Sequence, residues 1–157
     1  MDKRLAQARQ ALEQGYLETA AELLKPLVDA QDAEALFLRS TFSLPGEESE
    51  SMFEKRSLQF LKRSAELNYA PALYALGVCY SIGDLVSKNE RQATQYFKTA
   101  AALGYSKAKY EHGRNLLYGA PSLNKQVESG WQLIREAAAD DVEDASIFIH
   151  KFARKSF

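Results

Sequence analysis

Small and hydrophobic side chains recur at three- and four-residue spacings between residues 70 and 104. In the first half of this stretch, one helical face carries Ala72, Leu73, Leu76, Gly77 and Tyr80. In the second half, the same spacing gathers Ala93, Tyr96, Phe97, Ala100 and Ala101. Gly83 and Gly104 follow the two halves as stop signals. The stretch predicts two helices joined by a loop, with a close helix approach at Gly77.

A related unit recurs along most of the chain. Residues 68–83 align with residues 104–119 at a shift of about 36 residues, within the range of helical repeats. The aligned pairs are Tyr69 and Tyr105, Ala72 and Ala108, Tyr74 and Tyr110, Gly77 and Gly113, and Gly83 and Gly119. We expect a single all-α repeat domain over residues 1–157, an α/α superhelical solenoid. Its helix pairs are expected at residues 2–30, 32–67, 69–103 and 105–139, with a capping helix at 141–155.

Composition supports a helical protein with a sizeable core. The chain is 46% hydrophobic, has four prolines and lacks long alternating runs of valine and isoleucine, which disfavours strands. A formal net charge of −1 gives no reason to expect a nucleic-acid partner. No apolar run is long enough to span a bilayer, and the single cysteine, Cys79, favours a reducing compartment. We therefore expect a cytoplasmic protein with no membrane span.

The pattern of the central copy is that of a known repeat. It resembles the Sel-one-like repeat, a relative of the tetratricopeptide repeat, at Ala72, Leu76, Gly77, Tyr80, Gly83, Ala93, Phe97, Ala100, Ala101 and Gly104. In the copy at 105–139, His112 stands where leucine is usual, and in the copy at 32–67 Arg39 and Ser40 replace the Leu-Gly pair. The resemblance implies an α/α solenoid that contacts another protein and shares no catalytic residues. The cysteine-paired secreted branch of that family does not fit, because Cys79 stands alone.

Candidate catalytic chemistry is sparse. Metal sites need three or four converging ligands, and neither paired cysteines nor an HExxH motif occur. His112 is interpreted as a partly buried histidine at an apolar repeat position, and Cys79 as a small core residue. We expect no catalytic residue, no metal and no cofactor. The alternative is a hydrolase that uses His112, which a screen against generic hydrolase substrates would detect.

One row of repeat positions forms the candidate binding surface. Solenoids of this kind present the first helix of each pair on the concave side, and the expected partner-binding residues there are Phe37, Tyr74, Val78, Lys107, Tyr110, Arg114, Leu117 and Ile147. Aromatic side chains beside arginine are typical of interface hot spots. The alternative is that these rings only pack between adjacent helices. The expected partner is another protein, for example a toxin or effector, which makes the chain an adaptor, a regulator or an immunity protein of bacterial type.

Charge is unevenly distributed along the sequence. Residues 1–50 carry a balance of −5, which leaves +4 for the remainder of a chain whose total is −1. This uneven distribution of charge either steers a partner of matching polarity or is ordinary variation along a sequence. Lys107, Lys109 and Arg114 form a small basic cluster, which is either a solvated face or a contact for an acidic partner.

The sequence also predicts the mobility of one loop and the role of the last helix. The acidic loop at 44–51 is expected to be mobile, because it combines Pro45 and Gly46 with three glutamates. The last helix has acids near its start and bases near its end, namely Lys151, Arg154 and Lys155. This order suits the helix dipole and a capping role, whereas a basic amphipathic end for an anionic membrane is the alternative.

Overall fold

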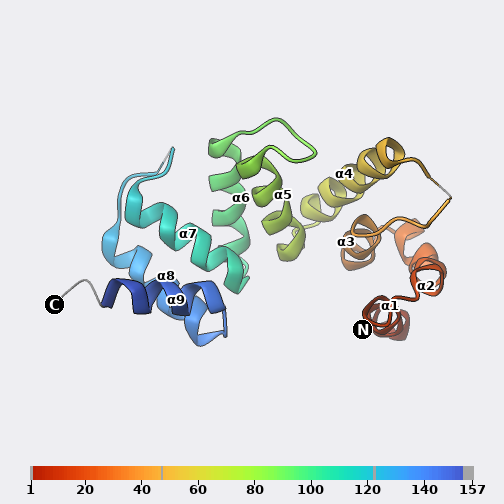
Figure 1. Cartoon of the computed structure of the whole chain (residues 1–157), viewed down its shortest axis with the longest axis horizontal. Helices are drawn as coiled ribbons and strands as arrows, with labels where there is room; N and C mark the ends of the chain where they lie inside the picture. Colours follow the sequence, from red (N-terminus) through yellow and green to blue (C-terminus); the bar gives the residue numbers. More distant parts are fainter. Residues whose placement is uncertain (1, 47, 122, 154–157) are drawn as a thin grey trace. The chain divides into compact units, whose positions relative to one another are not determined.

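The computed structural model describes residues 2–46, 48–121 and 123–153, and within these ranges it contains nine α-helices and no β-strand (Figure 1). The prediction of an all-helical chain built from paired repeat units is confirmed for the described part. The chain divides into two compact units, Met1–Ala72 and Leu73–Phe157, which are described separately. No helix in the described ranges combines the length and the apolar character needed to cross a membrane.

The first unit contains α1 (Lys3–Glu13), α2 (Leu17–Asp29), α3 (Ala33–Ser40) and α4 (Glu50–Glu66). Polar side chains cap three of these helices, as expected for the unpaired amides of a first turn. The Asp2 carboxylate accepts from the backbone of Arg4 at 2.9 Å, and the Asp32 carboxylate accepts from Ala35 at 2.8 Å. The Ser49 hydroxyl accepts from the α4 backbone at 3.3 Å.

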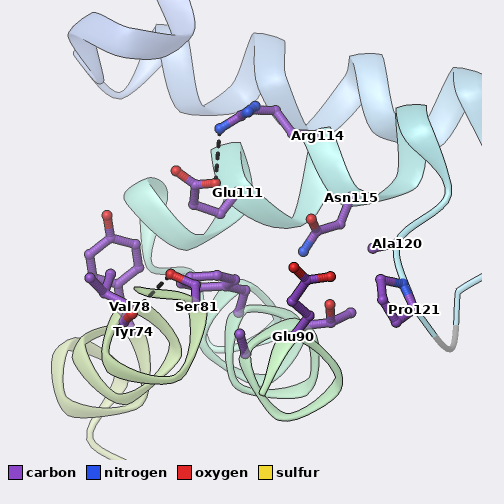
Figure 2. Close-up of a pocket in the computed structure, with 12 residues that line it drawn as sticks. Tyr74, Val78, Ser81, Glu90, Glu111, Arg114, Asn115, Ala120 and Pro121 are labelled. Carbon is purple, nitrogen blue, oxygen red and sulfur yellow. Dashed lines mark hydrogen bonds and ion pairs between the residues drawn. The ribbon is translucent and has the colours of Figure 1, made fainter. Parts of the chain in front are cut away.

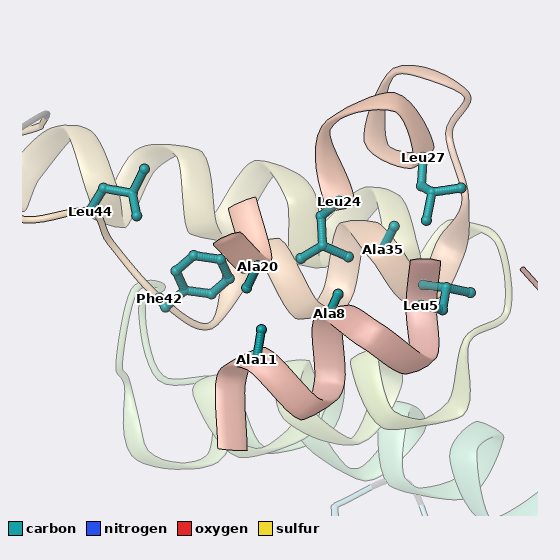
Figure 3. Close-up of a cluster of buried hydrophobic side chains, with 9 residues drawn as sticks. All are labelled: Leu5, Ala8, Ala11, Ala20, Leu24, Leu27, Ala35, Phe42 and Leu44. Carbon is teal, nitrogen blue, oxygen red and sulfur yellow. The ribbon is translucent and has the colours of Figure 1, made fainter. Parts of the chain in front are cut away.

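Small residues let the helices of the first unit pack closely. The buried side chains of α1, α2 and α3 point toward one another, and two residues of the following segment complete this core (Figure 3). The cluster consists of Leu5, Ala8, Ala11, Ala20, Leu24, Leu27, Ala35, Phe42 and Leu44. Ala8, Ala20 and Leu24 are fully shielded from solvent. Because alanine adds little bulk, the large leucines of one helix fit against its neighbour.

Two buried serines tie α4 to α3. The Ser57 hydroxyl donates to the carbonyl of Ser40 at 2.6 Å, and the Ser64 hydroxyl donates to the carbonyl of Ala33 at 2.6 Å. These bonds satisfy polar groups that would otherwise be buried without a partner. The weak second copy of the repeat therefore replaces part of its apolar packing with hydroxyl-to-backbone bonds.

The loop between α3 and α4 is tied to the helices on both sides. Phe42 and Leu44 lie in the core, and Arg56 of α4 donates to the carbonyls of Arg39 at 2.7 Å and Phe42 at 3.0 Å. Arg56 also pairs with Glu48 through two bonds of 2.6 and 3.0 Å. The sequence-based expectation of a mobile acidic loop did not foresee these contacts; Glu47 itself lies outside the described residues.

The second unit contains most of α5 (Ala70–Ile82), together with α6 (Glu90–Ala102), α7 (Ser106–Tyr118), α8 (Val127–Ala139) and α9 (Glu143–Ala153). The repeat glycines mark helix contacts, which confirms the prediction of close approach. A Cβ atom at Gly77 would lie 2.6 Å from the Phe97 ring. A Cβ atom at Gly113 would lie 2.8 Å from the backbone oxygen of Gly130. Glycine at these positions lets α5 meet α6 and α7 meet α8 at short range.

The last helix packs on α8. Ala145 of α9 is fully buried in a cluster with Leu117, Ile134 and Ala137, and Trp131 and Phe148 lie against that cluster. Phe148 and Trp131 have ring centroids 5.7 Å apart. The helix α9 therefore lies against α8, and its role as a cap for the final repeat stays a prediction. The helix bases Arg154 and Lys155, on which part of the capping and membrane interpretations rested, lie outside the described residues.

Candidate functional site

A hollow of about 490 Å³ opens between α5, the first half of α6, α7 and the segment that follows α7 (Figure 2). Val78, Ala93 and Phe97 provide its apolar wall. The polar part of its lining comes from Tyr74, Ser81, Glu90, Thr94, Glu111, Arg114 and Asn115. Figure 2 shows Glu90 of α6 pointing toward Asn115 of α7 across the opening. An apolar wall with a few converging polar groups is typical of a binding site.

A second hollow of about 560 Å³ adjoins the first and shares Tyr74 and Glu111 with it. It lies along the start of α7 and extends to the turn before α9. Its other lining residues are Gly104, Tyr105, Ser106, Lys107, Tyr110, Asp140, Asp141, Val142, Glu143 and Asp144. We call the surface formed by the lining residues of both hollows the α7 groove.

Three tyrosines of the groove are half-buried between helices. The Tyr74 ring packs against Phe97 at a centroid distance of 5.7 Å and against Tyr105 at 5.3 Å. The Tyr110 ring meets the edge of Phe148 at 6.0 Å. Burial raises the pKa of all three phenols above their ordinary value, so they stay neutral hydrogen-bonding groups at physiological pH. The three tyrosines therefore take part in helix packing and also line the groove.

Glu111 carries a partly desolvated charge at the junction of the two hollows. Its carboxylate accepts from the Arg114 guanidinium at 3.3 Å, within the same helix. Burial is the main cause that raises the pKa of Glu111; Arg114 lowers it, and Asp144 adds to the rise. Arg114 also lies over the Tyr110 ring, 5.5 Å from its centroid. A single long contact to Arg114 thus leaves the pKa of this carboxyl above its usual range.

Comparison with known families decides the identity of the repeat. The family model of the Sel1 repeat matches residues 70–105, which contain α5 and α6. The chain therefore contains a Sel1 repeat at residues 70–105. A crystal structure of a Sel1 repeat protein from Oxalobacter formigenes is similar, with 27% identity, a TM-score of 0.71 and coverage of 82% of this chain and 95% of that one.

Two further solved structures are similar to this chain. One is a protective antigen of uropathogenic Escherichia coli strains with an SLR fold, at 26% identity and a TM-score of 0.65. The match covers 79% of this chain but 26% of that antigen. Cysteine-rich protein B of Helicobacter pylori shares the fold at 17% identity and a TM-score of 0.57, over 92% and 96% of the two chains. No curated protein gives a significant sequence match.

The structure places five of the expected binding residues in the α7 groove. Tyr74, Val78 and Arg114 line the first hollow, and Lys107 and Tyr110 line the second. The tyrosine rings pack between helices and also line the groove, so their role in binding a partner stays a prediction.

Three expected binding residues lie elsewhere. Leu117 is 7% exposed and belongs to the core around α8, so it is a packing residue. Ile147 is exposed on α9 but does not line either hollow. Phe37 lies in the first unit, half-buried, with its ring 5.5 Å from Tyr69.

The acidic members of the groove were missed in the sequence. Glu111 follows the repeat tyrosine directly and lies one helical turn before Arg114 and Asn115, which is the available signal for a shared face. The basic cluster seen in the sequence does not persist as a free cluster. Lys109 pairs with Glu136 at 3.3 Å and Asp140 at 3.4 Å, and Arg114 pairs with Glu111.

Neither histidine nor cysteine chemistry lies in the groove. His112 lines neither hollow, and burial lowers the pKa of its imidazole, with a further contribution from Lys98. Cys79 is buried, and burial raises the pKa of its thiol, which disfavours the reactive thiolate. No group of three or more potential metal-binding His, Cys, Asp or Glu side chains occurs in the part of the chain that the structure describes.

Proposed function

We propose that this Sel1-repeat protein is a protein-interaction module that binds its partner in the α7 groove. Sel1 repeats are scaffolds of protein-interaction modules, which gives the general role. The observation that carries the more specific assignment is the pair of adjoining hollows, lined by three half-buried tyrosines and Arg114. Tyrosine and arginine in partly desolvated positions are the side chains that contribute most to protein interfaces.

The cellular role follows from what binding does to the partner. An adaptor joins two proteins, a regulator changes the activity of one, and an immunity protein neutralises a toxin by occupying its cleft. We place this activity in the cytoplasm, because a lone buried thiol at Cys79 suits a reducing compartment. A neighbouring gene that encodes a toxin would favour the immunity role among the three.

We propose a binding role in preference to the hydrolase alternative. His112, the residue on which that alternative rests, is not among the groove residues, and its Nδ1 atom has no hydrogen-bond partner in the described structure. A general base needs a substrate site within hydrogen-bond reach. A screen against generic hydrolase substrates should compare the wild-type chain with His112→Ala. Hydrolysis that depended on His112 would support the enzyme alternative.

Affinity capture from the source cells, read by mass spectrometry, tests the groove directly. Val78 lies half-buried in the wall of the first hollow, so Val78→Arg fills that hollow with a long side chain. Capture of the partner should fall at least about tenfold, the size expected for loss of an interface hot spot. The matched control is Gln95→Arg, which adds the same charge at an exposed position of α6 outside the groove.

Thermal unfolding separates loss of binding from loss of fold. Both variants should unfold close to the wild-type midpoint. Equal capture by Val78→Arg and the wild-type chain would contradict the groove assignment, and a large drop in midpoint for Val78→Arg alone would require a smaller change, such as Val78→Gln, at the same position.

A further inference from the structure

The α7 groove concentrates negative charge on a chain that is close to neutral overall. The formal net charge of the whole chain is −1. The charged residues that line the groove comprise six acids and two bases, namely Glu90, Glu111, Asp140, Asp141, Glu143, Asp144, Lys107 and Arg114. A hollow lined by one sign of charge attracts a ligand of the opposite sign.

Local ion pairs neutralise only part of this charge. Lys109 contacts Asp140 at 3.4 Å, Lys88 contacts Glu90 at 3.3 Å, and Arg114 contacts Glu111 at 3.3 Å. None of the ion pairs among the described residues involves Asp141, Glu143 or Asp144. Glu143 and Asp144 lie in the first turn of α9, where the helix dipole favours them. Their carboxylates nevertheless add negative electrostatic potential to the second hollow.

The groove already contains a receptor for a cation. The Arg114 guanidinium contacts the Glu111 carboxylate at 3.3 Å and lies over the Tyr110 ring, 5.5 Å from its centroid. A carboxylate next to an aromatic face binds a guanidinium or ammonium group by charge and by cation–π attraction. Tyr74 is a second aromatic side chain of the groove, and it lines both hollows together with Glu111. The Arg114 contact is a single hydrogen bond, so Glu111 keeps acceptor sites for an incoming donor.

We propose that the α7 groove binds a basic segment of the partner protein, with a lysine or arginine side chain entering between the Glu111 carboxylate and the Tyr74 ring. This inference rests on the proposed binding function and specifies the chemistry of the partner. It differs from the acidic partner that was one of the two alternatives for the basic cluster in the sequence. Two of the three bases in that cluster, Lys109 and Arg114, are paired with acids, while the carboxylates of the groove converge from α7, α9 and the turn between α8 and α9.

A displayed library of random peptides, selected on the immobilised full chain, provides the test. Enriched sequences should contain more lysine and arginine than the input library. Affinity for the best synthetic peptide should weaken at least about tenfold in Glu111→Gln, because a charge-assisted contact is lost. Asp144→Asn, at an exposed position, should weaken it less. Raising NaCl from about 0.05 M to about 0.5 M should weaken binding to the wild-type chain.

Glu128→Gln is the matched control, since Glu128 is an exposed carboxylate of α8 outside the groove. It should bind the peptide as the wild-type chain does. Basic peptides that bind equally to Glu111→Gln, Asp144→Asn and the wild-type chain would overturn the inference. Uncharged or acidic peptides that Val78→Arg releases would overturn the basic ligand while supporting the groove. Failure to enrich any peptide would count against both proposals.

Discussion

The two units each contain an arginine paired with a glutamate, but the two pairs differ in how completely they are satisfied. In the first unit, Arg56 makes two bonds to Glu48 and one to each of two backbone carbonyls. In the second unit, Arg114 makes one contact of 3.3 Å to Glu111, and its Nε atom has no hydrogen-bond partner. The Arg56 side chain is 20% exposed and the Arg114 side chain is 42% exposed.

This difference separates a structural pair from one that is available to a ligand. A guanidinium whose N–H donors are nearly all hydrogen-bonded holds its partners in one geometry. Arg56 holds the loop between α3 and α4 in this way. A guanidinium with unused donors beside a desolvated carboxylate can exchange partners at little cost. The Arg56–Glu48 pair therefore fixes a loop in the first unit, whereas the Arg114–Glu111 pair in the second unit stays available to a ligand.

The largest expected effect is on the stability of the first unit. Arg56→Ala leaves Glu48 and two carbonyls without their donor, which should cost about 3 kcal/mol of unfolding free energy. Arg114→Ala should cost less, about 1 kcal/mol, because it removes a single contact of a guanidinium that is 42% exposed. Chemical denaturation followed by circular dichroism measures both. Similar losses in the two variants would remove the proposed distinction between the pairs.

Close helix packing should make the second unit sensitive at a position outside the groove. Gly113→Ala places a Cβ atom 2.8 Å from the Gly130 carbonyl oxygen and 2.8 Å from a side-chain carbon of Ile134. Because backbone cannot yield easily, this overpacking should cost about 2 kcal/mol. The exposed Ala102→Gly is a control for the change in helix propensity, at about 1 kcal/mol or less. An unchanged midpoint for Gly113→Ala would show that α7 and α8 can separate without penalty.

The repeat pattern was sufficient to predict the helix pairs and their closest contacts. Gly83 and Gly104 end helices with positive φ angles of 81° and 87°, and Gly77 lies against Phe97. These features depend on residues that are near in sequence or fixed by the repeat. The contacts of Arg56 and the charge of the groove depend on side chains from separate elements, and periodicity does not show where such side chains converge. Leu117 shows the same limit, since its helix position alone did not reveal that α8 covers it.

The two glutamates should respond to pH in opposite directions. Hydrogen bonding to Arg56 is the main cause that lowers the pKa of Glu48 below its ordinary 4.5, so its stabilisation is present above that value and is lost as the pH falls through the lowered pKa. Burial raises the pKa of Glu111, so its ionised form carries a cost that is relieved as the pH falls through the raised pKa. At neutral pH, Glu48→Gln should therefore destabilise the chain by about 1 kcal/mol, and Glu111→Gln should leave it equally or slightly more stable.

Denaturation midpoints for these two variants, measured from neutral pH down to about pH 2.5, test this contrast. Glu48→Gln should lose part of the acid-induced drop, and Glu111→Gln should make that drop steeper. Destabilisation by Glu111→Gln at neutral pH as large as that of Glu48→Gln would show that both carboxylates are structural.

The smallest expected effect concerns a repeat position that carries a polar residue in both units. Arg39 in the first unit donates to the Phe42 carbonyl at 2.9 Å, whereas His112 in the second unit has an Nδ1 atom without a partner. Burial lowers the pKa of His112 below its ordinary 6.5, so protonation opposes folding, and stability should fall as the pH drops through that ordinary value. His112→Leu restores the usual apolar residue and should remove this part of the drop, by less than about 1 kcal/mol between pH of about 7.5 and 5.5. His150→Gln, at the exposed histidine, leaves His112 in place and should retain the drop. If His112→Leu lost stability at both pH values, the imidazole would hold a contact worth more than the burial it costs.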